Sequence, residues 1–187
     1  VYIPLEAGER FQNRIVQAAK VLDVDLNEHL FWIQLAQINL LEKNQKGIKE
    51  FIAGLRILEQ KTGRKIAMII VDTLSRAIPG GNENAPEDMT AFVSNCDFLW
   101  KEFKAFLLII HHTGKDESRG MRGHSSLLGA VDTEIEIKTI EGTDSKTKVA
   151  RVSKQRDDVE GEELGFSLEK VQCGLDSDGD HLTTCIV

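Results

Sequence analysis

The chain has 187 residues, of which 41% are hydrophobic and 28% are charged, and its formal net charge at pH 7 is −7. This composition is typical of one globular α/β domain and excludes a disordered or collagen-like protein. Its longest apolar runs have strand length, short of the roughly 18–20 residues of a membrane span, and the acidic balance gives no basis for nucleic-acid binding by the chain as a whole.

The first half of the chain alternates strand-like and helix-like segments. Strands are expected at residues 1–5, 66–71 and 106–110. The last two are continuously apolar, as in parallel strands that are buried on both faces. Apolar residues at a period of 3.6 predict helices over residues 9–22, from about 48 to near Gly63, and from about 87 to 104. This order predicts right-handed crossovers and a mostly parallel sheet.

The second half changes character after a polar loop at residues 113–124. A short helix is expected at residues 125–131. Four β-rich segments follow, separated by turn-rich joints: residues 133–140, 148–153, 164–173 and 181–187. They predict antiparallel hairpins added to the edge of the parallel sheet. No linker or repeat interrupts the chain, so a single domain is expected over residues 1–187.

The cysteines and the first residue bear on compartment and completeness. Cys96, Cys173 and Cys185 are far apart and form no Cys-x-x-Cys pair, which excludes a disulfide scaffold and predicts a reducing, cytoplasmic location. The chain starts at Val1 rather than Met and runs directly into an apolar strand. We therefore expect a fragment of a longer protein, with a processed terminus as the alternative.

An acidic residue follows the apolar segment that ends at Val71. Asp72 and Thr73 would lie at the carboxyl edge of a parallel sheet, where open α/β folds bind ligands. A carboxylate there suits Mg²⁺, which prefers oxygen ligands and is usually held through water in nucleotide hydrolases. The alternative is that Asp72 caps the helix after Thr73.

Polar residues follow the two other parallel strands as well. Adjacent residues of a strand point to opposite faces, so His111 and His112 are poorly placed to bind one metal, and one of them is better explained as a sensing or orienting group. The alternative is a histidine that hydrogen-bonds to nearby backbone. Glu6 ends the first strand, where a carboxylate could orient or deprotonate a water. Three polar strand ends would thus converge on one edge.

Two basic segments are further candidates. Lys154 and Arg156 are two residues apart on a strand, so they share a face and suit a phosphate; ordinary solvated charges are the alternative. Lys115, Arg119 and Arg122 lie in a Gly-rich loop before a helix, where they could contact an anion or a nucleic-acid phosphate, with a plain surface loop as the alternative.

In this order, the segments resemble the RecA-like ATPase core of hexameric replicative helicases. This is a group of DnaB-related, AAA-type P-loop ATPases, and the similarity is greatest to its plasmid RepA-like and phage branch. The matching segments are VYIPLEAGER (strand of the catalytic glutamate), MIIVDTLSR (Walker B strand), LLIIHHTGK (sensor strand), RGMRGHSSLLGAVD (the following loop and helix) and SKQRD (Lys-x-Arg strand).

The resemblance implies roles within one subunit. Glu6 would polarise the attacking water. Asp72, through water, would hold Mg²⁺, and Thr73 beside it would contribute to the ATP site. His112, or His111 as second choice, would couple the γ-phosphate to the DNA-contacting loop.

The resemblance also implies roles between molecules. Lys154 and Arg156 would reach the nucleotide of the neighbouring subunit, so a homo-oligomeric ring, in this family a hexamer, is expected. Arg122 would contact phosphate or the subunit interface, and Lys115, Arg119 and Arg122 would contact single-stranded DNA. The implied activity is an ATP- and Mg²⁺-dependent DNA helicase or translocase of plasmid or phage replication.

One family motif is missing. No Gly-Lys-Ser/Thr sequence occurs in the 187 residues, although a G-x-x-x-x-G-K-[ST] loop should precede the Glu6 strand. We expect this loop upstream of Val1 and expect the fragment alone to be inactive. The alternatives are a RecA-fold binding or assembly module without a P-loop, and a recombinase-like protein that forms filaments on DNA.

Overall fold

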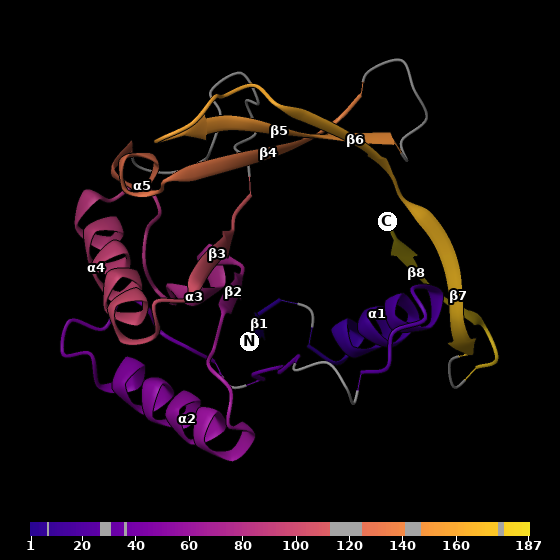
Figure 1. Cartoon of the computed structure of the whole chain (residues 1–187), viewed down its shortest axis with the longest axis horizontal. Coiled ribbons are helices and arrows are strands. Elements are labelled where there is room, and N and C mark those ends of the chain that lie inside the picture. Colours follow the sequence, from indigo (N-terminus) through magenta and orange to yellow (C-terminus); the bar gives the residue numbers. More distant parts are fainter. Residues whose placement is uncertain (7, 27–30, 36, 113–124, 141–146, 176–177) are drawn as a thin grey trace. The chain divides into compact units, whose positions relative to one another are not determined.

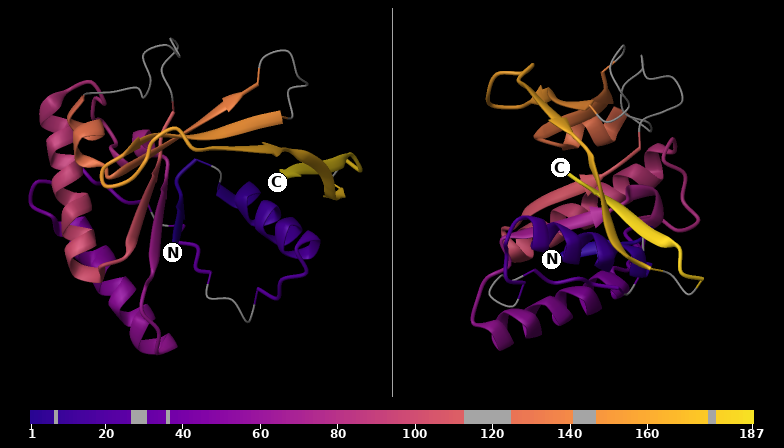
Figure 2. Two further views of the ribbon diagram at one scale, coloured as in Figure 1. Left: turned by 45° about the horizontal axis from the view of Figure 1, so that its top comes forward. Right: turned by 90° about the vertical axis from the view of Figure 1, so that its right-hand side faces the viewer.

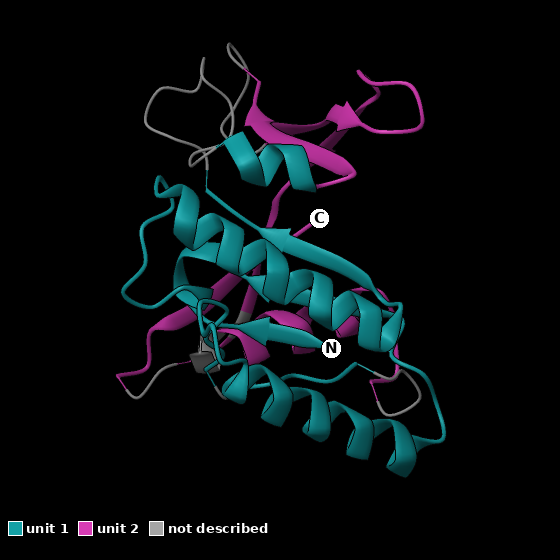
Figure 3. Ribbon diagram, turned by 90° about the vertical axis from the view of Figure 1, so that its left-hand side faces the viewer, with its two compact units in different colours: residues 1–8, 31–130 teal, residues 9–30, 131–187 magenta. Residues whose placement is uncertain are grey.

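A computed structural model of the chain describes every residue except 7, 27–30, 36, 113–124, 141–146 and 176–177 (Figure 1). Its backbone contacts form two compact units, coloured separately in Figure 3. Unit 1 comprises Val1–Gly8 and Phe31–Ala130, and unit 2 comprises Glu9–Leu30 and Val131–Val187. Within the described residues, no helix combines the length and apolarity that crossing a membrane requires. The expectation of a single domain stays a prediction.

Unit 1 contains the predicted parallel sheet. Its strands are β1 (Tyr2–Pro4), β2 (Met68–Asp72) and β3 (Phe106–Ile110), in the order β1-β2-β3. All pairs are parallel, and Pro4, Asp72 and Ile110 lie side by side in the register. The carboxyl ends of the three strands are therefore aligned at one edge. One isolated parallel bridge joins Tyr2 of β1 to Ile33, which lies outside the named strands in an apolar run at residues 30–35.

Among the described residues of unit 1 there are four helices, and two of them are long. They are α2 (Lys46–Thr62), α3 (Leu74–Ala77), α4 (Pro86–Phe103) and α5 (Ser125–Ala130). As predicted, α2 ends at Gly63, whose φ of 65° is in the left-handed region that glycine adopts without strain. Pro86 opens α4, where its missing N–H costs no hydrogen bond. Figure 2 shows α2 and α4 against the same face of the sheet.

The core of unit 1 lies between these helices and one face of the sheet. Ile69 and Val71 of β2 point into it together with the buried side chains of α2 and α4. On the opposite face, Met68, Leu108 and Phe106 are 40%, 36% and 57% exposed. The expectation that both apolar strands are buried on both faces is therefore wrong. Side chains of a strand alternate between faces, and the two long helices cover only one of them.

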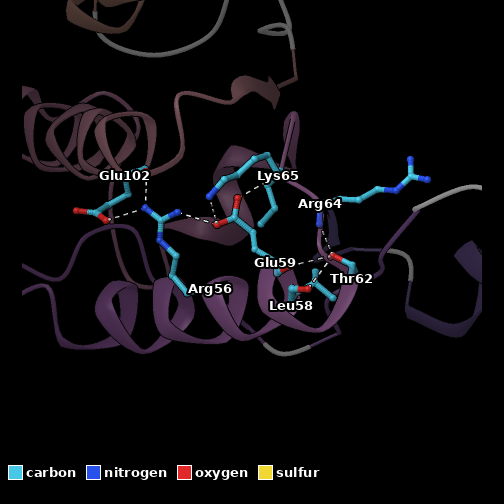
Figure 4. Close-up of polar contacts among 8 residues, drawn as sticks. Arg56, Leu58, Glu59, Thr62, Arg64, Lys65 and Glu102 are labelled. Atoms are coloured by element: carbon cyan, nitrogen blue, oxygen red, sulfur yellow. Dashed lines mark hydrogen bonds and ion pairs between the residues drawn. The ribbon is translucent and has the colours of Figure 1, made fainter.

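A partly buried group of charged side chains ties α2 to the C-terminal end of α4 (Figure 4). The Glu59 carboxylate, only 8% exposed, accepts hydrogen bonds from Arg56 Nη1 at 2.7 Å and from the Ile66 N–H at 3.1 Å. Arg56 also donates to the carbonyl oxygen of Glu102, and its guanidinium lies 4.4 Å from the centre of the Phe103 ring. Burial opposes ionisation of Glu59, but the two hydrogen bonds together with the charges of Lys65 and Arg56 outweigh it and lower the pKa of this carboxyl.

Unit 2 contains antiparallel strands and most of α1 (Gly8–Val21). β4 (Thr133–Thr139), β5 (Thr147–Gln155) and β6 (Glu163–Ser167) form one sheet, and β7 (Glu169–Leu175) and β8 (His181–Ile186) form a hairpin. The prediction of antiparallel hairpins is confirmed.

Two details of the second half differ from the sequence-based expectations. The segment expected as one strand at residues 164–173 divides at Leu168, because β6 pairs with β5 whereas β7 pairs with β8. In the described part of the chain, these hairpins also form sheets of their own rather than extending the edge of the parallel sheet. Each strand finds its hydrogen-bonding partner in a nearby segment, so the parallel sheet is not needed as a template.

Candidate functional site

The aligned strand ends of unit 1 bring several predicted site residues together. Glu6 follows β1, Asp72 ends β2 with Thr73 after it, and His111 and His112 follow β3. The Leu5 N–H donates to the backbone oxygen of Asp72 at 2.6 Å, which holds the first two strand ends in place beyond the regular ladder. This edge is the part of an open α/β sheet where ligands bind.

Glu6 is at the centre of the polar contacts. Its Oε1 accepts a hydrogen bond from the Thr73 hydroxyl at 2.8 Å, and it lies 3.5 Å from His112 Nε2 and 3.9 Å from Arg76 Nε. The Thr73 hydrogen bond, followed by the charges of His112 and Arg76, outweighs desolvation and lowers the pKa of Glu6. The carboxylate is therefore ionised at neutral pH. Its side chain is 34% exposed, so it can contact a water or a ligand.

Asp72 is held from a neighbouring strand. The Tyr2 hydroxyl donates a hydrogen bond to its Oδ2 at 2.5 Å. The alternative in which Asp72 caps the next helix is wrong, because the residue at the N-cap of α3 is Thr73. Thr73 itself is 2% exposed, and its hydroxyl contacts Glu6 and, at 3.0 Å, Ser75. The peptide bond between Asp72 and Thr73 is cis.

Of the two histidines, His112 is the one that contacts Glu6. His111 is half-buried, whereas His112 is exposed, as expected for neighbours that point to opposite sides of an extended segment. The sequence-based reasoning missed Arg76 and Tyr2. Arg76 follows Asp72 by four residues, so one helical turn after the strand returns it to the edge. Nothing in the sequence indicates that Tyr2 reaches Asp72, because this contact depends on the register of β1 against β2.

The predicted cations divide into two groups. Lys154, in β5, donates to the backbone oxygen of Val131 at 2.8 Å, and Arg156, just after β5, forms a 2.6 Å ion pair with Asp132. Both side chains thus contact the two residues that precede β4. The other three, Lys115, Arg119 and Arg122, lie outside the described residues.

The donor atoms at the sheet edge fit a hydrated Mg²⁺ that is bound together with phosphates. In the part of the chain that the structure describes, no group of three or more His, Cys, Asp or Glu side chains could hold a metal ion by itself. Mg²⁺ usually keeps several waters and binds through one or two carboxylates plus the substrate's phosphates. Asp72 and Glu6, at adjacent strand ends, supply carboxylates of this kind.

Comparisons with known proteins agree on the fold. The model of a protein family described as an AAA domain matches residues 1–118. A solved structure titled "Crystal structure of the RadB recombinase" superposes with a TM-score of 0.59 at 15% sequence identity, and the match covers 90% of this chain and 74% of that chain. A search of curated proteins finds no match. The predicted fold class, an α/β RecA-like core with additional antiparallel strands, is confirmed.

Proposed function

Because the chain belongs to the AAA-domain family and has a RecA-like fold, we propose that it is the ATP-hydrolysing core of a DNA helicase or translocase that acts in plasmid or phage DNA replication. The observation that carries this proposal is the cluster at the sheet edge. An ionised Glu6, held by Thr73 and close to His112, lies at the strand end next to Asp72. A water-activating carboxylate beside a metal-binding carboxylate is what phosphoryl transfer to water requires.

Each residue of the cluster has a task in this mechanism. Bound Mg²⁺ would neutralise charge on the phosphates, and Asp72 would hold it through water. Glu6 orients the attacking water and accepts its proton. The Thr73 hydroxyl fixes the Glu6 carboxylate in place and favours its ionised form. The Thr73 end of this hydrogen bond is buried, whereas the Glu6 end remains accessible to water.

His112 connects hydrolysis to DNA. Its ring contacts Glu6, and the chain continues from it directly into residues 113–124. A change of charge at Glu6 or at the phosphates would alter that contact and act on the segment that follows, whose Lys115, Arg119 and Arg122 would bind the backbone of single-stranded DNA. His111 is the second choice for this role.

Lys154 and Arg156 act on the nucleotide of the next subunit. An arginine supplied by a neighbour stabilises the charge of the transferring phosphoryl group. In the single chain, the two cations contact the backbone oxygen of Val131 and the carboxylate of Asp132, and in the assembly they exchange these partners for phosphates. Activity therefore requires a homo-oligomeric ring, with a hexamer as the expected form.

The proposal is tested by ATP hydrolysis with the protein as its gene encodes it, with and without single-stranded DNA. We expect DNA-stimulated turnover in the wild type. In Glu6→Gln, turnover falls on the order of a hundredfold or more while nucleotide binding persists, because only the general base is lost. Glu50→Gln, which alters an exposed glutamate of α2, is the matched control and keeps wild-type turnover. Equal turnover in Glu6→Gln and the control would remove Glu6 from the mechanism.

A second candidate is a recombinase-like protein that forms filaments on DNA, and the likeness to the RadB recombinase favours it. A strand-displacement assay separates the two. A helicase displaces a labelled strand from a forked duplex during ATP hydrolysis. A filament protein instead coats the single strand and promotes its exchange with a homologous duplex. It does not unwind a forked duplex when no homologous strand is present.

A further inference from the structure

The hydrogen bond from Tyr2 to Asp72 links two residues that are 70 positions apart in the chain. In the register of β1 against β2, Tyr2 is opposite Ile70 and Pro4 is opposite Asp72. The phenol therefore reaches diagonally along the sheet, to the strand end where Asp72 lies. Long aromatic side chains can span this spacing, whereas most others cannot.

The backbone of Tyr2 is anchored by the segment that contains Trp32. The backbone N–H of Tyr2 donates to the backbone carbonyl oxygen of Trp32 at 2.8 Å, and the backbone carbonyl oxygen of Tyr2 accepts from the Gln34 N–H at 2.9 Å. The ring also lies near Phe31, with 6.0 Å between the ring centres. The two backbone hydrogen bonds fix the point from which the side chain starts, and the hydrogen bond of the hydroxyl to Asp72 fixes its other end.

The constraint acts on one oxygen of the carboxylate. Among the described residues, the Tyr2 hydroxyl is the side-chain donor to the Asp72 carboxylate, and the oxygen that accepts its hydrogen bond is Oδ2. A donor on one oxygen fixes the rotamer of the carboxylate and leaves the other oxygen available. Hydrogen bonds from outer residues to metal-binding side chains orient them in the same manner.

We propose that Tyr2 is a positioning residue for the metal: its hydroxyl holds the Asp72 carboxylate in the orientation that accepts the water shell of Mg²⁺. This inference rests on the proposed function, in which Asp72 holds Mg²⁺ through water. It adds a residue of β1 to the nucleotide site through the hydroxyl alone. The ring serves packing, and the hydroxyl serves the metal.

The experiment measures how much Mg²⁺ strengthens binding of a non-hydrolysable ATP analogue. Affinity is determined by calorimetry in excess EDTA and in excess Mg²⁺, with the protein as its gene encodes it. Tyr2→Phe removes the hydroxyl and keeps the ring. We expect it to weaken the Mg²⁺-bound affinity about tenfold, in line with the loss of an outer-shell hydrogen bond, and to leave the metal-free affinity unchanged.

Two further variants separate the possible causes. Asp72→Asn is expected to abolish most of the effect of Mg²⁺. Phe31→Leu removes the ring neighbour of Tyr2 but keeps the hydroxyl, so it retains the full effect of Mg²⁺. Circular dichroism of each variant verifies that the fold is intact.

The outcomes are distinguishable. If Mg²⁺ does not strengthen binding in the wild type, or if Asp72→Asn keeps the full effect of Mg²⁺, the metal role of Asp72 fails and the role of Tyr2 fails with it. If Asp72→Asn loses the effect but Tyr2→Phe keeps it, only the role of Tyr2 is overturned. Equal weakening with and without metal in Tyr2→Phe, or the same loss in Phe31→Leu, means that Tyr2 serves packing alone.

A spectroscopic readout is independent of affinity. Tyr2 is the only tyrosine among the 187 residues, and after labelling with 3-fluorotyrosine its ¹⁹F resonance is the one that Tyr2→Phe removes. We expect this resonance to shift when Mg²⁺ is added to the complex with the analogue, and we expect no shift in Asp72→Asn. An unresponsive resonance in the wild type would overturn the proposal.

Discussion

Among single residues, Thr73 has the largest effect on the ionisation of the Glu6 carboxyl. Its hydroxyl is the strongest of the influences that lower the pKa of Glu6, ahead of the charges of His112 and Arg76. A general base must be deprotonated before it can act. In the proposed mechanism, where Glu6 is the general base, the hydrogen bond at 2.8 Å would therefore extend activity toward acidic pH.

This predicts a shifted pH profile for Thr73→Val. Valine keeps the shape of threonine but cannot donate, so the pKa of Glu6 rises toward its usual value. The acidic limb of the profile of kcat/KM for ATP hydrolysis then moves to higher pH, while the alkaline limb stays in place. Thr90→Val is the control, because the exposed Thr90 hydroxyl donates only to the Pro86 oxygen within its own helix. An unmoved acidic limb in Thr73→Val would assign it to another group.

At the scale of elements, the pair of Arg56 and Glu59 determines how α2 is fixed to its surroundings. Glu59 accepts from the Ile66 N–H just ahead of β2, and Arg56 reaches Glu102 near the end of α4. One pair thus connects a helix to the approach of a strand and to a second helix. A buried carboxylate with satisfied hydrogen bonds is tolerated, whereas removing its charge leaves the arginine without its main partner.

Glu59→Gln is accordingly expected to reduce the free energy of unfolding by about 1.5–3 kcal/mol at neutral pH, the typical contribution of a hydrogen bond to a charged group. Urea denaturation measures this loss of stability, and Glu50→Gln on the exposed side of α2 should change the stability by less than about 0.5 kcal/mol.

The pKa of Glu59 is lower in the folded state than its usual value. The stabilisation is therefore complete above the usual carboxyl range and is lost as the pH falls through the lowered value. The difference between Glu59→Gln and the wild type should shrink in acid.

For the whole molecule, the proposed mechanism joins residues of two subunits in one site. Glu6 and Asp72 belong to unit 1 of one chain, and Lys154 and Arg156 belong to unit 2 of its neighbour. A site of this kind is complete only in the assembly.

Subunit mixing tests this arrangement. Arg156→Ala alone should lower turnover on the order of a thousandfold, the effect of removing an arginine finger, with nucleotide binding retained. Glu6→Gln alone is inactive as well. Mixed oligomers of the two variants should partially recover activity, because an intact Glu6 then meets an intact Arg156 across some interfaces. Arg151→Ala is the control, since that β5 cation pairs with Glu163 of β6. Absence of recovery in oligomers that are shown to mix would exclude the shared site.

Much of the fold could be predicted because its signals are local. The apolar segment within β2 is followed by Asp72, the one that forms β3 is followed by the two histidines, and the end of α2 is marked by Gly63. These patterns depend on the chemistry of neighbouring residues. The convergence of Glu6, Asp72 and His112 then follows from parallel strands.

The rest could not be predicted because it depends on which distant segments meet. The hydrogen bond from Tyr2 to Asp72 requires the register of β1 against β2. The contact of Arg56 with Glu102 requires the packing of two helices. Similarly, the alternation of apolar residues around Leu168 indicates strands but not their partners, so the division between β6 and β7 is not encoded in a local pattern.

The hydrogen bond between Thr73 and Glu6 also has a consequence for how the protein folds. It spans 67 residues, and closing a loop of that length costs roughly 4 kcal/mol of chain entropy. Contacts of such long range form late and slow folding. During synthesis, β1 emerges well before β2, its parallel partner in the sheet, so this pair of strands cannot form until β2 is made. The cluster at the sheet edge therefore cannot be complete until β3 and His112 after it have been made.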